Sequence, residues 1–158
     1  MAEPEAAGAV PAPHPERRAF MTRLFGAGAL AVAASASATP ARAAGPEHAP
    51  FIARAQDMRA RALAAGDQGF GAVVVKDGRV VGDGPSRVVT ATDPTAHAEI
   101  EAIRDAARKL GSSNLAGCIL YSTFRPCRMC EAAAYWAGIQ RFYHGADGQD
   151  GGAPRLGC

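Results

Sequence analysis

The sequence carries little net charge, few cysteines and no long hydrophobic run. Its formal net charge is +2 over 158 residues, which provides no broad basic face, so a nucleic-acid partner is not expected. Two of the four cysteines have the spacing of metal ligands, so a disulfide framework is not expected either. The apolar stretch over residues 24–38 is shorter than the roughly 20 residues of a membrane-spanning helix. What remains is a globular protein without a membrane span, in which 48% of residues are apolar.

The N-terminal residues have the features of an export signal. Arg17 and Arg18 are followed by Phe20, then by the weakly apolar stretch and a small-x-small cleavage site. This order resembles a twin-arginine signal peptide. We therefore predict that residues 1–43 are removed, that residues 44–158 form one domain with a short C-terminal part, and that the protein is periplasmic or secreted. The alternative is a disordered leader rich in alanine and proline on a cytosolic protein.

The rest of the chain predicts alternating helices and strands. Asp77-Gly78 is typical of a hairpin turn, and Asp93 followed by Pro94 is typical of a helix start. The expected elements are a helix over 51–62, strands over 70–76 and 79–81, a helix over 93–110, a strand over 118–123, a helix over 126–138 and a strand over 139–143. The last strand–helix–strand unit implies a parallel strand pair. We expect an α/β fold with a mixed sheet, and no further element after Gly145.

Two short motifs combine into one predicted zinc site. They are His97-Ala98-Glu99 and Pro126-Cys127-Arg128-Met129-Cys130. A histidine and two cysteines are good zinc ligands, and three ligands leave the fourth tetrahedral position open for water. Glu99 need not bind the metal and can move protons beside that water. We therefore predict one Zn²⁺ per chain, held by His97, Cys127 and Cys130.

The helix positions of these residues raise one geometric question. Cys127 and Cys130 are three residues apart in a first helical turn, so they share a face near the positive end of the helix dipole. His97 and Glu99 are two residues apart and do not share a helix face. Both side chains reach one site only if it lies off the helix end or if the side chains bend around the helix.

Other uses of these residue types remain open. A Cys-x-x-Cys pair alone is compatible with redox chemistry or with structural zinc. A redox pair needs no His-x-Glu motif, and a structural site wants a fourth protein ligand. The candidates for that ligand are His14, His48, His144, Cys118 and Cys158.

At these motifs the chain resembles the cytidine and deoxycytidylate deaminase superfamily, and within it the bacterial guanine deaminases and tRNA adenosine deaminases. The resemblance covers about residues 48–145, with matching segments at 69–78, 93–104, 118–123 and 126–137. The run Ala134-Tyr135-Trp136-Ala137 favours the guanine deaminases. The resemblance implies a three-layer α/β/α sandwich with a central mixed sheet, and a homodimer. It also implies the zinc ligands given above, with Glu99 as the proton shuttle.

The chain departs from these relatives at two positions near the predicted site. Arg125 stands where the relatives usually carry glutamate before Pro-Cys, and Ser86 stands where they carry a base-binding asparagine. Serine offers one hydroxyl in place of the paired donor and acceptor of an amide. From the resemblance we expect substrate contacts at Ser86, Arg125 and Trp136 and at the main chain of Ala98.

We therefore predict a zinc-dependent hydrolytic deaminase. Its expected substrate is a small nucleobase, a nucleoside or a related amino-heterocycle, and it releases ammonia. Two alternatives stay open: a zinc-stabilised binding domain with weakened catalysis, and an exported deaminase of nucleic acid. Release of ammonia by the zinc-loaded protein separates the first alternative from the prediction.

Overall fold

The computed structural model describes residues 45–157, and the predicted signal peptide lies outside the described residues. A five-stranded sheet in the order β2-β1-β3-β4-β5 forms the centre. The strands are β1 (Gly71–Lys76), β2 (Arg79–Pro85), β3 (Ile119–Ser122), β4 (Arg141–His144) and β5 (Gln149–Gly152). The helices are α1 (Ala49–Ala64), α2 (Ala98–Leu110) and α3 (Arg128–Trp136), and the 3-10 turn η1 (Pro46–His48) precedes α1.

The sheet is mixed, as the sequence predicts. β1 pairs antiparallel with both β2 and β3, and β4 pairs antiparallel with β5. β3 and β4 are parallel, and α3 is the helix of the connection between them. The predicted strand–helix–strand unit and its parallel pair are therefore confirmed.

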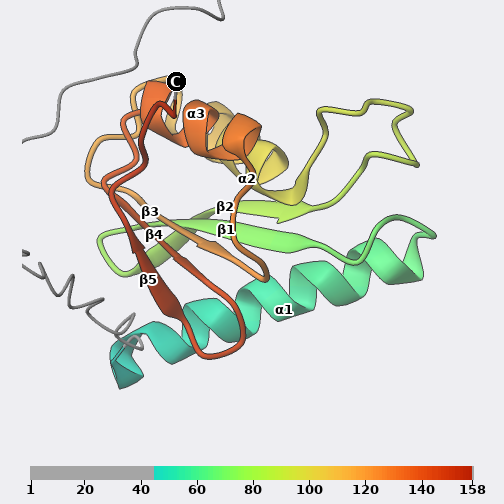
Figure 1. The fold of residues 1–158 in the computed structure, drawn as a ribbon, viewed down its shortest axis with the longest axis horizontal. Coiled ribbons are helices and arrows are strands. Elements are labelled where there is room, and N and C mark those ends of the chain that lie inside the picture. Colours follow the sequence, from blue (N-terminus) through green and yellow to red (C-terminus); the bar gives the residue numbers. More distant parts are fainter. Residues whose placement is uncertain (1–44, 158) are drawn as a thin grey trace, which may run out of the picture. The chain divides into compact units, whose positions relative to one another are not determined.

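Helices cover both faces of the sheet. α1 lies on one face, and α2 and α3 lie on the other (Figure 1). Alternate residues of β1 divide between two clusters of buried side chains: Val73 and Val75 pack in the cluster on the α1 side, and Ala72 and Val74 in the cluster with α2. Because the side chains of a strand alternate between faces, a strand that is apolar at every position suits a sheet covered on both sides. The three-layer α/β/α sandwich is confirmed.

Close contact between β2 and α2 fixes the position of α2. A Cβ atom added at Gly84 would lie 2.1 Å from the Ala98 carbonyl oxygen, and one added at Gly82 would lie 2.3 Å from that of Ala102. Only glycine permits this approach of strand backbone to helix backbone. β2 pairs with β1 as far as Pro85, beyond the predicted end at residue 81, and the close contacts of its glycines hold the first turn of α2 against the sheet.

Both helices that carry the predicted zinc ligands begin later than the sequence predicts. Asp93 does not start α2, because its carboxylate accepts the backbone N–H of Thr95 at 2.8 Å and the Thr95 hydroxyl at 2.7 Å. Such a local turn competes with helix formation. α2 therefore starts at Ala98, and α3 starts at Arg128, two residues after Pro126.

The C-terminal part contains a strand that the sequence does not predict. β5 pairs with β4, and the Arg141 side chain contacts the Asp150 carboxylate across the pair.

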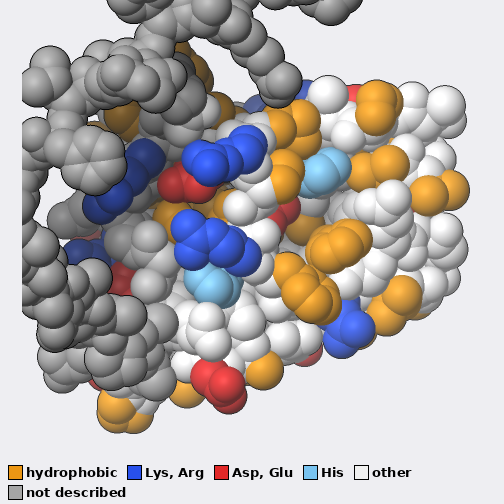
Figure 2. Space-filling view, in the orientation of Figure 1, with side chains coloured by type: hydrophobic (Ala, Val, Ile, Leu, Met, Phe, Trp, Pro, Cys, Tyr) orange, Lys and Arg blue, Asp and Glu red, His pale blue; other side chains and the backbone are white. Residues whose placement is uncertain are grey.

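Large hydrophobic side chains stay exposed on the surface, including Phe124 and Trp136, and Figure 2 shows hydrophobic side chains on the surface of one face. Within residues 45–157, no helix has both the length and the apolar character needed to cross a membrane.

Candidate functional site

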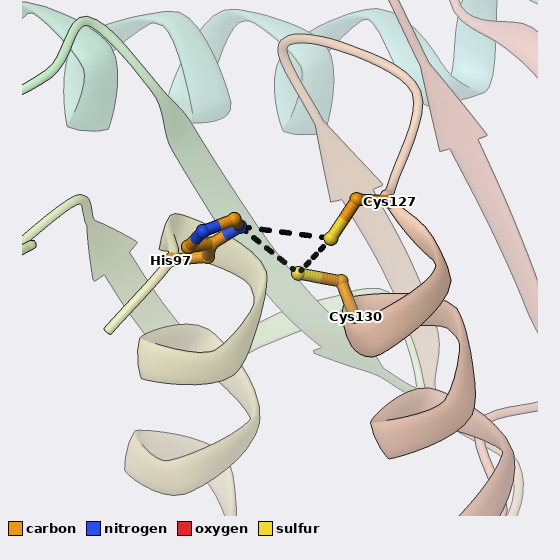
Figure 3. A group of neighbouring side chains, drawn as sticks. All are labelled: His97, Cys127 and Cys130. Carbon is orange, nitrogen blue, oxygen red and sulfur yellow. Dashed lines mark hydrogen bonds between the residues drawn. The ribbon is translucent and has the colours of Figure 1, made fainter. Parts of the chain in front are cut away.

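Three side chains from two helix starts meet beside the sheet. His97 Nδ1 lies 3.7 Å from Cys127 Sγ and 3.6 Å from Cys130 Sγ, and the two sulfur atoms are 3.6 Å apart. Figure 3 shows the three side chains pointing toward one another from α2 and α3. Within residues 45–157 they are the one group of three potential ligand side chains that converges in this way.

The backbone at the two helix starts explains this convergence. His97 is the N-cap of α2, with the extended angles φ −63° and ψ 153°, and Cys127 is the extended N-cap of α3. Each side chain therefore leaves the chain just before its helix, and Cys130 follows in the first turn of α3. Since His97 precedes the helix and Glu99 lies inside it, the two need not share a helix face. The site lies off the helix end, which answers the geometric question that the sequence raises.

The triangle of ligand atoms fits zinc. Zinc bonds of about 2.3 Å to sulfur and about 2.0–2.1 Å to nitrogen place tetrahedral ligand atoms about 3.6–3.8 Å apart. The observed separations of 3.6 and 3.7 Å agree with these values. Thiolate and imidazole are also the donor types that zinc prefers. Cys130 is buried whereas Cys127 is exposed, so the centre can be reached from solvent on the Cys127 side.

Burial also affects the protonation of the ligands. Burial raises the pKa of the Cys130 thiol well above its ordinary value, and the nearby Glu99 carboxylate and Cys127 raise that pKa further. The Cys130 thiol therefore stays protonated when no cation is near. A metal ion that binds here must displace this proton, as thiolate-bound metals do in general.

Glu99 lies next to the ligand atoms and is held by a partner from the sheet. Its side chain is 7% exposed, and its Oε2 lies 3.4 Å from Cys130 Sγ. The buried hydroxyl of Ser122, at the end of β3, donates a hydrogen bond of 2.8 Å to Oε1. One carboxylate oxygen is thus fixed while the other faces the centre.

Sequence reasoning missed Ser122. It is the last residue of β3 and, together with Thr123, forms a buried polar pair at the end of an apolar strand. A polar residue at the end of a buried strand, directly before the site loop, is a usable signal, because buried hydroxyls need a partner. The sequence does not show that this partner is Glu99, which lies 23 positions away.

Ser86, a predicted substrate contact, is buried, and its hydroxyl is hydrogen-bonded within the protein. It is 2% exposed, and its hydroxyl donates to Asp67 Oδ1 at 2.9 Å. Asp67 also accepts hydrogen bonds from the backbone N–H groups of Val89 and Thr90 and from the Thr90 hydroxyl. Desolvation of Asp67 favours a higher pKa, but hydrogen bonds from the backbone N–H groups of Thr90 and Gln68 and from the hydroxyls of Ser86 and Thr90 outweigh it, so the pKa of Asp67 is lowered overall. Asp67 therefore fixes the loop between β2 and α2.

The other predicted substrate contacts are spread over a wider area. Ala98 is fully buried and is the first residue of α2, directly after His97. Arg125 is exposed and lies two residues before Cys127, with its guanidinium carbon 5.7 Å from the centre of the Phe142 ring. These two flank the metal ligands in the sequence.

Trp136 is not brought to the ligands within one chain. It ends α3, whose other end carries the cysteines, and a helical rise of about 1.5 Å per residue separates the two ends by about 12 Å. Its side chain is 74% exposed. A substrate contact at Trp136 stays a prediction.

None of the other candidate ligands among residues 45–157 joins the group. His48, His144 and Cys118 lie among the described residues, and the converging group does not include them. His14 and Cys158 lie outside the described residues. The described part of the chain therefore provides three ligands, the number that leaves a coordination position for water.

Comparisons with known proteins agree with this site. The family model of the cytidine and deoxycytidylate deaminase zinc-binding region matches residues 46–146. The guanine deaminase of Bacillus subtilis (strain 168) is 44% identical over 104 residues, which are 65% of this chain and 67% of that protein. The tRNA-specific adenosine deaminase of Agrobacterium fabrum is 48% identical over 88 residues, which are 56% of this chain and 58% of that protein.

A solved structure extends the likeness to three dimensions. The X-ray structure of guanine deaminase from Bacillus subtilis matches with a TM-score of 0.59 and 44% identity, over 61% of this chain and 62% of that one. These matches span about three fifths to two thirds of the relatives' lengths.

Proposed function

The chain belongs to the cytidine and deoxycytidylate deaminase family, and we propose from this that it is a zinc-dependent hydrolytic deaminase of a small amino-heterocycle, such as a nucleobase or a nucleoside. One observation carries the proposal: three zinc-type ligand atoms 3.6–3.7 Å apart lie next to a buried carboxylate that is not part of the triangle. This arrangement provides both a metal with an open position and a proton carrier.

The chain's own residues supply orientation and proton transfer. His97, Cys127 and Cys130 would hold the zinc, which when bound lowers the pKa of water so that hydroxide is available near neutral pH. Glu99 takes the proton of the attacking water on Oε2, while the Ser122 hydroxyl holds Oε1. Glu99 delivers this proton to the ring nitrogen, and it then carries the second proton of the water, from the new C–OH group, to the leaving amine. Water and the amino-heterocycle become the oxo-heterocycle and ammonia.

The relatives support an amino-substituted ring as the substrate. They include a guanine deaminase and a tRNA-specific adenosine deaminase, so we infer a nucleobase-like ring here. A net charge of +2 does not favour a polyanion, and for this reason we place a small molecule before a nucleic acid.

Three further parts of the proposal have indirect support. One zinc per chain agrees with the single converging ligand group of residues 45–157. A homodimer agrees with the exposed Tyr135 and Trp136 at the end of α3, which a second copy would cover. Export to the periplasm or out of the cell agrees with Arg17, Arg18 and the stretch that follows them.

An ammonia-release screen tests the proposed function. Zinc-loaded protein is incubated with nucleobases, nucleosides and aminopteridines, and with tRNA and single-stranded DNA as the nucleic-acid arm. The control is Glu99→Gln, which keeps the side-chain shape and all three ligands. We expect this variant to retain zinc and to lose turnover by about a hundredfold or more. Release of no ammonia from any substrate, with zinc bound, would favour a binding domain instead.

A further inference from the structure

A cavity that three arginines line opens beside the candidate metal centre. Its volume is about 570 Å³, and its lining includes Cys127, Arg125, Arg128 and Arg155. Arg128 is the first residue of α3, and Arg155 lies in the segment after β5. That segment reaches α3, because the backbone N–H of Arg155 donates to Glu131 Oε1 at 3.2 Å. The cavity therefore joins one predicted zinc ligand to three cationic side chains from two parts of the chain.

Neighbouring acids do not neutralise these arginines. All three are exposed, and within residues 45–157 none of them forms an ion pair within 4.0 Å. Glu131 is the one acidic residue in the lining, and one of its oxygens already accepts the Arg155 N–H. The cavity is cationic although the whole chain is almost neutral.

One neighbouring feature adds to the positive potential of the cavity, and a second responds to the charge of Arg125. The first turn of α3 has no side-chain cap. Its backbone N–H groups and the positive end of its dipole therefore lie at the end of the helix that lines the cavity. Burial lowers the pKa of His144 in β4, and the positive charge of Arg125 lowers that pKa further. The charge of Arg125 therefore acts on the end of β4 as well as on the cavity.

We propose that the substrate carries an anionic group, a phosphate or a carboxylate, which Arg125, Arg128 and Arg155 bind while the amino-bearing ring lies at the metal centre. This inference rests on the proposed function and names the substrate class. The paired N–H donors of a guanidinium match the oxygens of both anions. One cavity with three arginines suits the single anionic group of a small molecule, whereas a polyanion needs contacts along a longer basic track.

Matched substrate pairs test this preference. The zinc-loaded protein is assayed with adenosine and its 5′-phosphate, guanosine and its 5′-phosphate, and pterin and pterin-6-carboxylate. We expect kcat/KM to be about tenfold or more higher for the anionic member of at least one pair, since charge-assisted hydrogen bonds exceed neutral ones in strength. The phosphate pairs and the carboxylate pair separate the two anions. Equal kcat/KM within each pair overturns the proposal.

Substitutions assign the preference to the cavity. Arg125→Gln, Arg128→Gln and Arg155→Gln should each reduce the anionic-to-neutral ratio of kcat/KM. The matched control is Arg61→Gln on α1, which removes the same charge from an exposed arginine without an ion pair among the described residues. If the control lowers the ratio as much as the cavity variants do, the preference comes from overall charge and the proposal is wrong.

A binding measurement separates this inference from the proposed function. Calorimetry with inorganic phosphate and with acetate is done on zinc-loaded Glu99→Gln protein, which needs no turnover. We expect one of these anions to bind, and binding to weaken about tenfold or more in the triple arginine variant. Binding that survives in the triple variant is binding to the metal and overturns the proposal. Arginine-dependent binding without any deamination keeps the anion site and removes the proposed function.

Discussion

Glu99 and Ser122 form the smallest unit on which the proposed chemistry depends. The two side chains are 7% and 5% exposed, and the hydrogen bond between them is 2.8 Å long. A carboxylate that must accept and return a proton needs one orientation, and Ser122 fixes that orientation from the sheet. Ser122 acts through Glu99 in the proposed chemistry, so we assign it as a positioning residue.

Ser122→Ala should reduce kcat by roughly tenfold, because a buried carboxylate oxygen loses its donor. KM and zinc content should change little, since neither the ligands nor the anion cavity is touched. Ser122→Thr keeps the hydroxyl and should restore most of the rate. Steady-state kinetics with metal analysis of both variants checks this. An alanine variant with normal kcat would show that Glu99 is held by other contacts.

Cys127→Ala should remove most of the zinc, because two ligands seldom hold the ion against competition from water. Cys118→Ala is the matched control, since Cys118 is a buried free cysteine outside the converging group. Metal content per chain, measured after dialysis, is expected to fall only in the first variant. Full zinc occupancy in Cys127→Ala would contradict the ligand assignment.

At the scale of elements, the sequence predicts the kind of each helix and strand better than where it begins. The strand β1 follows from its run of apolar residues, and the parallel β3–β4 pair follows from the order strand, helix, strand. The start of α2 does not, because Asp93 and Thr95 hydrogen-bond each other instead of capping the helix. That local choice moves His97 from inside a predicted helix to its N-cap.

Elements that depend on pairing with another element, and not on their own composition, are the least predictable. β5 is composed of Gln149, Asp150 and two glycines, residue types that disfavour strands, and its pairing with β4 makes it a strand. The end of β2 likewise depends on its pairing with β1, which reaches Pro85. The group of His97, Cys127 and Cys130 was predictable from two motifs, whereas the partners of Glu99 and Ser86 come from residues about 20 positions away.

The loop between β2 and α2 depends on Asp67. Its pKa is lowered in the fold, so its contribution to stability is present above an unfolded-state pKa of about 3.9 and is lost as the pH falls below that value. Asp67→Asn should therefore lower Tm most near pH 7, and the difference from the unmodified protein should shrink below about pH 4.

Thermal unfolding of both proteins in zinc-free form checks this prediction, because loss of bound zinc at low pH then does not contribute to the change in Tm. Asp57→Asn, an exposed change on α1, is the control and should show little pH-dependent difference. A difference for Asp67→Asn that stays constant from pH 7 to pH 3 would mean that ionised Asp67 does not support the loop.

For the whole molecule, the proposed route of export matters for the metal. Twin-arginine export moves folded proteins, so zinc would be bound before Cys127 and Cys130 meet an oxidising compartment. Arg17→Lys with Arg18→Lys should leave full-length precursor in the cytoplasm, because the paired arginines are what the export route recognises. Cell fractionation with N-terminal sequencing checks this. Mature periplasmic protein in unchanged amount would exclude the route.

The two edges of the sheet have a consequence for the behaviour of the protein in concentrated solution. β2 and β5 are the outer strands of the described sheet, and each contains two glycines, while β2 ends in proline. An outer strand that is long, flat and hydrophobic can pair with the sheet of another molecule and begin aggregation. β5 is four residues long, and its carboxylate Asp150 contacts Arg141, so it offers a short and polar edge. The outer strands should therefore resist pairing with other molecules and so resist fibril formation. This holds although the inner strands β1 and β3 consist largely of residues that favour β-structure.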